Sequence, residues 1–186
     1  MTVRLTLLAA APTGPAAARG IRFGDDRPPG EQERERILAA AARLPDAGRH
    51  FTAPSARCRE TARLLGLAAA VEPDLRDGDM GAWTGRTLDD VAARDPASLG
   101  AWTTDPDAAP HGGESVSDLC ARVAGWLDRL PDGTGRAVAV TGPTVVRAAV
   151  VHALGAGPGA FARVDVLPLS VAQFTGRGGR WNLRLA

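Results

Sequence analysis

Two segments of the sequence place anion-binding groups at the starts of predicted helices. Arg57 lies in the first turn of a helix that opens at Pro54, where free backbone N–H groups and a positive dipole end are available. Gly142 lies between Thr141 and Thr144 in a break that opens another helix. Because guanidinium groups and helix N-termini both bind oxyanions, we expect a pocket of phosphate or carboxylate size. On spacing alone, Arg57 could equally be a surface arginine.

Several kinds of chemistry are excluded by residue type. All 22 basic residues are arginine, so neither a Schiff-base lysine nor a P-loop lysine is present. The three histidines, His50, His111 and His152, are too far apart in sequence to suggest a metal-ligand cluster, and we expect neither a metal nor a cofactor. Cys58 and Cys120 both fall in helical patterns and are expected to be reduced, half-buried thiols.

A parallel sheet is needed to bring the anion-binding segments together. Leu5–Ala11 is an apolar run of strand length, typical of a strand buried on both faces, and Arg136–Thr141 has the same character. His50–Ala53 is a shorter strand candidate. Ligands bind beyond the carboxyl ends of parallel strands, so the loops that follow these three strands should converge at one edge of the sheet.

Helices alternate with strands along the rest of the chain. The helical patterns cover Glu31–Leu44, Pro54–Leu65, Thr87–Arg94, a short segment ending at Trp102, Glu114–Leu130 and Thr144–Leu154. Near the end of the chain, Leu169–Thr175 and Trp181–Leu185 are predicted to be edge strands joined by a glycine-rich turn. This alternation predicts an α/β protein with a mostly parallel sheet, and residues 1–186 suit one domain.

Composition and charge narrow the possible partners. The chain has 186 residues, 45% of them hydrophobic and 23% charged, as in ordinary globular proteins. A net charge of +1 implies no nucleic-acid partner and no anionic membrane. Leu5–Ala11 is too short for a membrane-spanning helix or for the apolar core of a signal peptide. Arg4 alone is also a weak version of the basic region that precedes such a core. We therefore expect a cytoplasmic protein without a targeting segment.

Five blocks of the chain, in order, carry a family resemblance. They are Leu5–Thr13, Ala53–Ala62 (Ala-Pro-Ser-Ala-Arg-Cys-Arg-Glu-Thr-Ala), Leu75–Gly85 (Leu-Arg-Asp, then Met-Gly-Ala-Trp-Thr-Gly), Pro110–Ser115 (Pro-His-Gly-Gly-Glu-Ser) and Val140–Arg147 (Val-Thr-Gly-Pro-Thr-Val-Val-Arg). Together they resemble the histidine phosphatase superfamily. The resemblance implies the phosphoglycerate-mutase-like fold, a three-layer α/β/α sandwich, and phosphoryl transfer through a phosphohistidine.

This sequence departs from the family pattern at the catalytic positions. The family's nucleophilic histidine aligns with Ala10, and its second histidine aligns with Gly142. Its acid, usually glutamate, aligns with Asp77, whereas its phosphate-binding arginine is retained as Arg57. A phosphohistidine requires an imidazole nitrogen as nucleophile, which alanine and glycine do not provide. The resemblance is therefore to a degenerate member that lacks both catalytic histidines.

Two remaining residues could contribute acid–base or nucleophilic chemistry. Asp77 is the best acid–base candidate, although an aspartate in a glycine-rich loop is also a common turn residue. By resemblance, His111 borders the pocket, where it could act as a substitute nucleophile or simply as a loop residue. Trp83 and Trp102 could line an apolar wall of the pocket or pack in the core.

These residues support three functional interpretations. In the first, the protein is not a catalyst and binds a small anionic ligand or a protein partner through the former active-site cleft. The ligand-binding residues would be Arg57, Ala10, Thr141, Gly142, Thr144 and His111. In this interpretation the site is widened and has an apolar alanine floor. In the second, Asp77 and Arg57 support a changed chemistry; in the third, His111 supports weak phosphatase activity. The sequence leaves the oligomeric state open.

Overall fold

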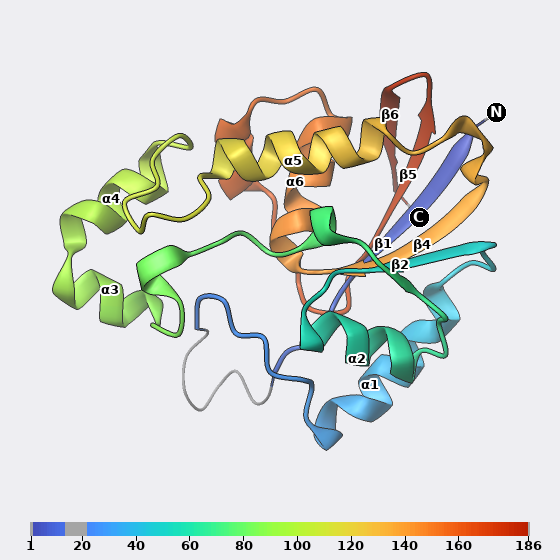
Figure 1. Cartoon of the computed structure of the whole chain (residues 1–186), viewed down its shortest axis with the longest axis horizontal. Helices are drawn as coiled ribbons and strands as arrows, with labels where there is room; N and C mark the ends of the chain where they lie inside the picture. Colours follow the sequence, from blue (N-terminus) through green and yellow to red (C-terminus); the bar gives the residue numbers. More distant parts are fainter. Residues whose placement is uncertain (1, 14–21, 186) are drawn as a thin grey trace.

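One mixed sheet forms the centre of the protein. The computed structural model describes residues 2–13 and 22–185 (Figure 1). Within that part, the sheet has the strand order β3-β2-β4-β1-β5-β6. The strands are β1 Val3–Ala9, β2 Arg49–Thr52, β3 Ala70–Val71, β4 Arg136–Thr141, β5 Val171–Arg177 and β6 Arg180–Arg184. The first four strands of the chain run parallel, and β5 and β6 are antiparallel to their neighbours.

The buried position of β1 was predicted correctly. Leu5, Leu7 and Leu8 are all within 1% of complete burial, although successive side chains of a strand point to opposite faces. Because β1 lies between β4 and β5, both of its edges are hydrogen-bonded as well. From Leu5 onward β1 has neither a face nor an edge open to solvent, which explains why every residue from Leu5 to Ala9 except Thr6 is apolar.

Helices cover both faces of the sheet. Helices α1 (Arg34–Ala40) and α2 (Ala56–Leu64) lie on one side, and α5 (Val116–Asp128) and α6 (Pro143–Ala153) lie on the other (Figure 1). This confirms the α/β class and the three-layer α/β/α arrangement. Two further helices, α3 (Leu88–Arg94) and α4 (Pro96–Thr104), lie away from the sheet (Figure 1). None of the described helices is both long and apolar enough to cross a membrane.

The helix predicted over residues 31–44 is divided into three parts. Only α1 is α-helical, and short 3₁₀ turns precede and follow it at Glu31–Glu33 and Ala41–Arg43. The amino-terminal boundary residue, Gly30, has no side chain to cap the helix, and 3₁₀ turns are a common way for uncapped helix ends to tighten.

The prediction that both carboxyl-terminal strands are edge strands was wrong for β5. This strand lies between β1 and β6, and only β6 is at the edge. The side chain of Phe174 on β5 is buried in the core, which an edge position would expose more. The connecting turn was placed correctly: Gly178 and Gly179 have φ values of 56° and 74°, as a tight two-residue hairpin turn requires.

Close backbone packing joins the loop before α5 to the loop that follows η3, a 3₁₀ turn at Pro73–Leu75. The N–H of Glu114 donates to the carbonyl of Asp79 over 2.8 Å. A Cβ on Gly113 would overlap that same carbonyl and would lie 2.8 Å from the backbone nitrogen of Gly81. Only glycine therefore allows these two loops to approach so closely.

We expect Gly113→Ala to destabilise the protein by about 1–3 kcal/mol, because the added methyl group must push two backbone segments apart. Urea unfolding would measure the effect. Gly100→Ala is the control, because a Cβ at this position in α4 meets nothing within 4 Å. Within a helix that change should stabilise the protein by about 0.5–1 kcal/mol. Similar effects of the two substitutions would contradict the packing argument.

Candidate functional site

The loops after β1, β2 and β4 converge at the carboxyl ends of these strands, as predicted. The three strands run parallel, so these ends lie at one edge of the sheet. The N–H of Ala10 donates to the carbonyl of Thr141 over 2.8 Å, and the N–H of Ala53 donates to the carbonyl of Val140 over 2.9 Å. These bonds hold the three segments side by side as they leave the sheet, which brings the amino ends of α2 and α6 to the same edge.

Arg57 and Asp77 form an ion pair at this edge. Arg57 Nη2 and Asp77 Oδ2 are 2.6 Å apart. The exposed fractions of the two side chains are 16% and 28%, so Arg57 is largely buried rather than a free surface arginine. Its Nε–H is buried and lacks a hydrogen-bond partner in the described part of the chain. The guanidinium thus has a buried donor without a partner beside an occupied one.

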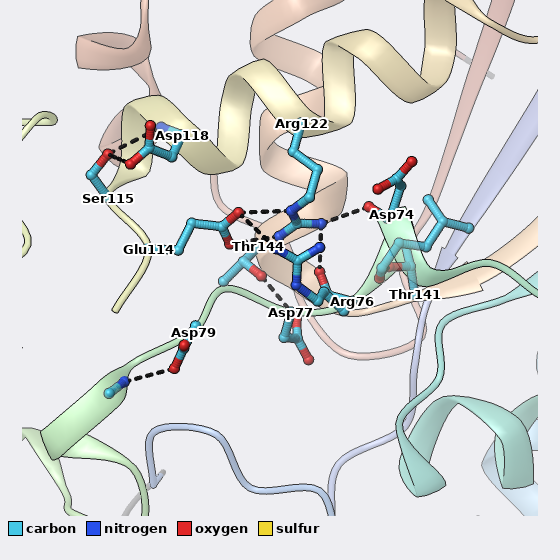
Figure 2. Close-up of polar contacts among 12 residues, drawn as sticks. Asp74, Arg76, Asp77, Asp79, Glu114, Ser115, Asp118, Arg122, Thr141 and Thr144 are labelled. Atoms are coloured by element: carbon cyan, nitrogen blue, oxygen red, sulfur yellow. Dashed lines mark hydrogen bonds and ion pairs between the residues drawn. The ribbon is translucent and has the colours of Figure 1, made fainter. Parts of the chain in front are cut away.

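The second oxygen of Asp77 is held at the start of α6. The hydroxyl of Thr144 donates to Asp77 Oδ1 over 2.8 Å (Figure 2). A Cβ added to Gly142, the N-cap residue of α6, would overlap the Asp77 carboxylate. The carboxylate therefore occupies the space into which any side chain at position 142 would extend. Glycine at that position is what lets Asp77 reach both Arg57 and Thr144.

Ala10 and Thr141, both predicted to contact a ligand, have no exposed surface in this conformation. The hydroxyl of Thr141 donates to the carbonyl of Leu75 over 2.7 Å, which ties β4 to the loop that carries Asp77. Ala9 and Ala11 are also fully buried, so the expected apolar floor is closed. The side chain of Thr141 therefore positions the loop and presents no surface to a ligand.

His111 forms no hydrogen bond or ion pair with Arg57 or Asp77 in the described part of the chain. Its side chain is buried, and its Nδ1 accepts a hydrogen bond from the N–H of Gly113 over 3.0 Å. Burial lowers the pKa of the imidazole, so the neutral ring is favoured, and the proton then lies on Nε2. His111 packs against Trp83, which also contacts Phe23 and Trp102. The two tryptophans thus belong to an aromatic cluster with His111.

One ion pair that the sequence did not predict supports the loop that carries Asp77. Arg122 on α5 donates from Nε and Nη2 to the two carboxylate oxygens of Glu114, over 2.7 and 2.6 Å. The Nη1 of Arg122 also donates to the carbonyls of Asp74 and Arg76 (Figure 2). Both charged side chains are only 10% exposed. Glu114 falls within a recognised motif, but nothing in the sequence marked Arg122 as its partner.

Comparison with known proteins identifies the family. The model of the histidine phosphatase superfamily (branch 1) matches residues 19–186. The chain belongs to this superfamily. A bifunctional protein of Mycobacterium tuberculosis, Rv2228c, is 37% identical over 121 residues, which is 63% of this chain and 33% of that protein. The chain thus spans about a third of the length of the curated relatives that it matches first.

Several solved structures are similar to this chain over nearly its whole length. A structure described as mycobacterial hydrolase 1 is 26% identical with a TM-score of 0.84, covering 100% of this chain and 98% of its own. Mycobacterial glucosyl-3-phosphoglycerate phosphatase in complex with VO₃ is 27% identical with a TM-score of 0.82, covering 98% and 97%. The α-ribazole phosphatase of Shigella flexneri, at 19% identity and a TM-score of 0.85, covering 98% and 95%, shares the fold.

Neither cysteine adds reactivity to this histidine phosphatase fold. Cys58 and Cys120 are free and buried, rather than half-buried as predicted. Burial raises the pKa of the Cys58 thiol to about 12, and the nearby Asp77 carboxylate adds to the shift. Burial also raises the pKa of Cys120 to about 11. Because the thiolate is the nucleophilic form, both thiols are inert at neutral pH.

We expect Gly142→Ala to destabilise the protein by about 1–3 kcal/mol, because the new methyl group displaces the Asp77 carboxylate from Arg57 and Thr144. In an Asp77→Ala background, which has no carboxylate to displace, the same substitution should cost much less. Urea unfolding of the wild type, both single variants and the double variant would give the coupling free energy between the two positions.

Gly157→Ala is the matched control for this experiment. Gly142 and Gly157 both precede a proline at the start of a helix, with φ of −74° and ψ of 158° and 165°. A Cβ on Gly157 meets nothing within 4 Å. Its replacement should therefore have little effect in either background. If Gly142→Ala costs the same with and without the Asp77 carboxylate, the steric coupling is wrong.

Proposed function

We propose that this chain is a catalytically inactive member of the histidine phosphatase superfamily that binds a small anion-bearing ligand at Arg57. The observation that carries this proposal is the Asp77 carboxylate. It lies against Gly142, bound by Arg57 and Thr144, where the resemblance places the family's second histidine. A side-chain anion thus occupies the centre of the candidate site.

Loss of phosphatase chemistry is supported at two positions. Ala10 aligns with the nucleophilic histidine, and its methyl group is buried and offers no nucleophile. At position 142, a neighbouring carboxylate fills the place of a side chain. The sequence led us to expect a site widened by the loss of two imidazoles. The structure instead has this space filled by the Asp77 carboxylate and by buried alanines. His111 does not favour a substitute mechanism, because its Nδ1 is hydrogen-bonded and its Nε2 is buried.

A changed acid–base chemistry has less support than anion binding. Both oxygens of Asp77 are already bound, one by a guanidinium group and one by a hydroxyl group. A general acid or base must instead reach a substrate atom within hydrogen-bond distance. The same two contacts favour anion binding, because Arg57, Thr144 and the amino end of α6 together accommodate a carboxylate. A carboxylate and a phosphate offer similar oxyanion edges to such donors.

The internal carboxylate sets the affinity that we expect. An incoming anion must displace Asp77 from Arg57 or bind beside it against charge repulsion. Phosphate or sulfate should therefore bind only in the millimolar range, which corresponds to about 4 kcal/mol. The Arg57 side chain is 16% exposed and its Nε is buried, so an incoming anion would meet the accessible part of the guanidinium rather than the Nε–H. Because the three alanines are buried, the rest of the ligand must contact other surfaces.

We expect no useful phosphomonoesterase activity from the wild type or from Ala10→His alone. The single substitution restores one imidazole in a site where several groups act together, and such groups contribute non-additively. An aryl phosphate and phosphoglycerates should be assayed between about pH 5 and 8, the range in which histidine titrates. Wild-type turnover of about 1 s⁻¹ or faster, typical of enzymes, would refute the non-catalytic assignment.

We expect Asp77→Asn to strengthen phosphate binding by about tenfold or more, because two like charges near one cation repel by several kcal/mol at short range. Arg57→Gln should abolish binding, because it removes the only cationic partner of the site's carboxylate in the described structure. Titration of phosphate by calorimetry or NMR would measure both effects. Asn is suitable because it keeps the size of the side chain and its ability to hydrogen-bond to Thr144.

The double variant Asp77→Asn with Arg57→Gln is the control. It should bind phosphate no better than Arg57→Gln alone. A gain that persists without Arg57 would place the anion elsewhere and overturn the site. Equal affinities of the wild type and Asp77→Asn would show that the carboxylate does not compete with the ligand.

A further inference from the structure

A group of arginines lies on one face of the sheet, away from the candidate site. Its members are Arg4 on β1, Arg136 on β4, Arg177 on β5, and Arg180 and Arg184 on β6, and all five side chains are exposed. Strand register puts them on the same face, because Arg4 is opposite Arg136 and Thr175, and residues two apart on a strand share a face. We call this group the arginine face.

The arginine face contains two unfavourable pairs of like charges. Arg4 is directly opposite Arg136 in the parallel pair β1–β4, and Arg177 is directly opposite Arg180 at the end of the β5–β6 hairpin. Like charges opposite each other on neighbouring strands destabilise a sheet. In the described part of the chain, none of the five arginines forms an ion pair.

The arginine face is at the opposite end of the sheet from Arg57. Arg4 and Arg136 are near the amino ends of β1 and β4, whereas the candidate site lies beyond their carboxyl ends. The β5–β6 hairpin lies at the same end as the start of β1 (Figure 1). A shallow pocket of about 310 Å³ beside the hairpin is lined by Thr2, Thr175, Gly176, Arg177, Arg180 and Asn182. The two regions therefore cannot share one small ligand.

We propose that the arginine face binds the phosphate backbone of a duplex nucleic acid without reading its sequence. The side chains between the arginines are Gln173, Thr175 and Asn182, which are hydrogen-bond donors suited to phosphate oxygens. These three positions offer no large apolar anchor, which a protein interface normally has at its centre. They also carry no aromatic ring on which the bases of a single strand would stack.

The net charge of the chain hides this local concentration of charge. A value of +1 led us to expect no nucleic-acid partner, but it averages over 22 arginines and 21 carboxylates. On the arginine face, the five cations lie on four adjacent strands spaced about 4.8 Å apart, without a paired carboxylate among the described residues. Backbone binding depends on such local clusters rather than on net charge.

Binding of a fluorescent 20-base-pair duplex, followed by anisotropy at several salt concentrations, tests the proposal. We expect a dissociation constant of about 10⁻⁴ to 10⁻⁶ M and a strong salt dependence. The double variant Arg177→Gln with Arg180→Gln should bind at least about tenfold more weakly. Its slope of log K against log salt should fall in magnitude by about 2, because each lost phosphate contact removes about 0.9.

Arg94→Gln with Arg163→Gln is the matched control. Both arginines are exposed, lie outside the sheet, and give the same change in net charge. This variant should bind the duplex with the wild-type slope. If the two double variants lose affinity equally, the net charge of the chain explains binding, and the proposal of a local site is overturned. Failure of the wild type to bind the duplex would also overturn it.

Three other ligands, tested in the same binding assay, distinguish a duplex from other classes of partner. A single-stranded oligonucleotide of the same length, a poly-glutamate peptide and phosphatidylserine vesicles should all bind more weakly than the duplex. Preference for any of the three would assign the arginine face to another class of partner and refute the proposal. Because Arg57→Gln leaves this face intact, that variant should bind the duplex normally, which keeps this test independent of the proposed anion site.

Discussion

The Asp77 carboxylate, which fills the space that a side chain on Gly142 would need, is the constraint on which the candidate site depends. It holds one oxygen near Arg57 and the other near Thr144, so a cation from α2 and a hydroxyl from α6 are joined through one side chain. Charge-assisted hydrogen bonds of this kind are among the stronger contacts in proteins. They also neutralise a guanidinium group that is mostly removed from water, which would be costly if it were left unpaired.

Buried polar groups bind the loop that carries Asp77 on two sides. Thr141 binds the carbonyl of Leu75 from the sheet side, and Arg122 binds the carbonyls of Asp74 and Arg76 from α5. Arg122 is in turn neutralised by Glu114, and both charges are almost fully buried. Breaking one partner of such a pair leaves an uncompensated buried charge. The position of Asp77 thus depends on a network outside the pocket.

Periodicity and motif order sufficed for the fold, whereas the details of the site depended on contacts that sequence patterns do not encode. The apolar run around Leu7 has the length of a strand, fills both alternation phases and ends at a proline, so β1 was predictable. The pairing of Arg57 with Asp77 was not, because Arg57 lies on α2 and Asp77 lies in a later loop, and the two become neighbours only through the sheet order. Likewise, an apolar residue such as Ala10 can line an open floor or pack in the core, and its sequence context is the same in both cases.

Glycine at position 142 also constrains how this protein can change over evolutionary time. An imidazole at that position requires the Asp77 carboxylate to leave first, because the two cannot occupy one volume. Removal of the carboxylate alone, however, leaves Arg57 largely buried without its anion. Each first step back from the proposed non-catalytic state therefore costs stability before any chemistry is regained. Because the glycine and the carboxylate share one space, the order in which the two positions are substituted matters as much as the residues that replace them.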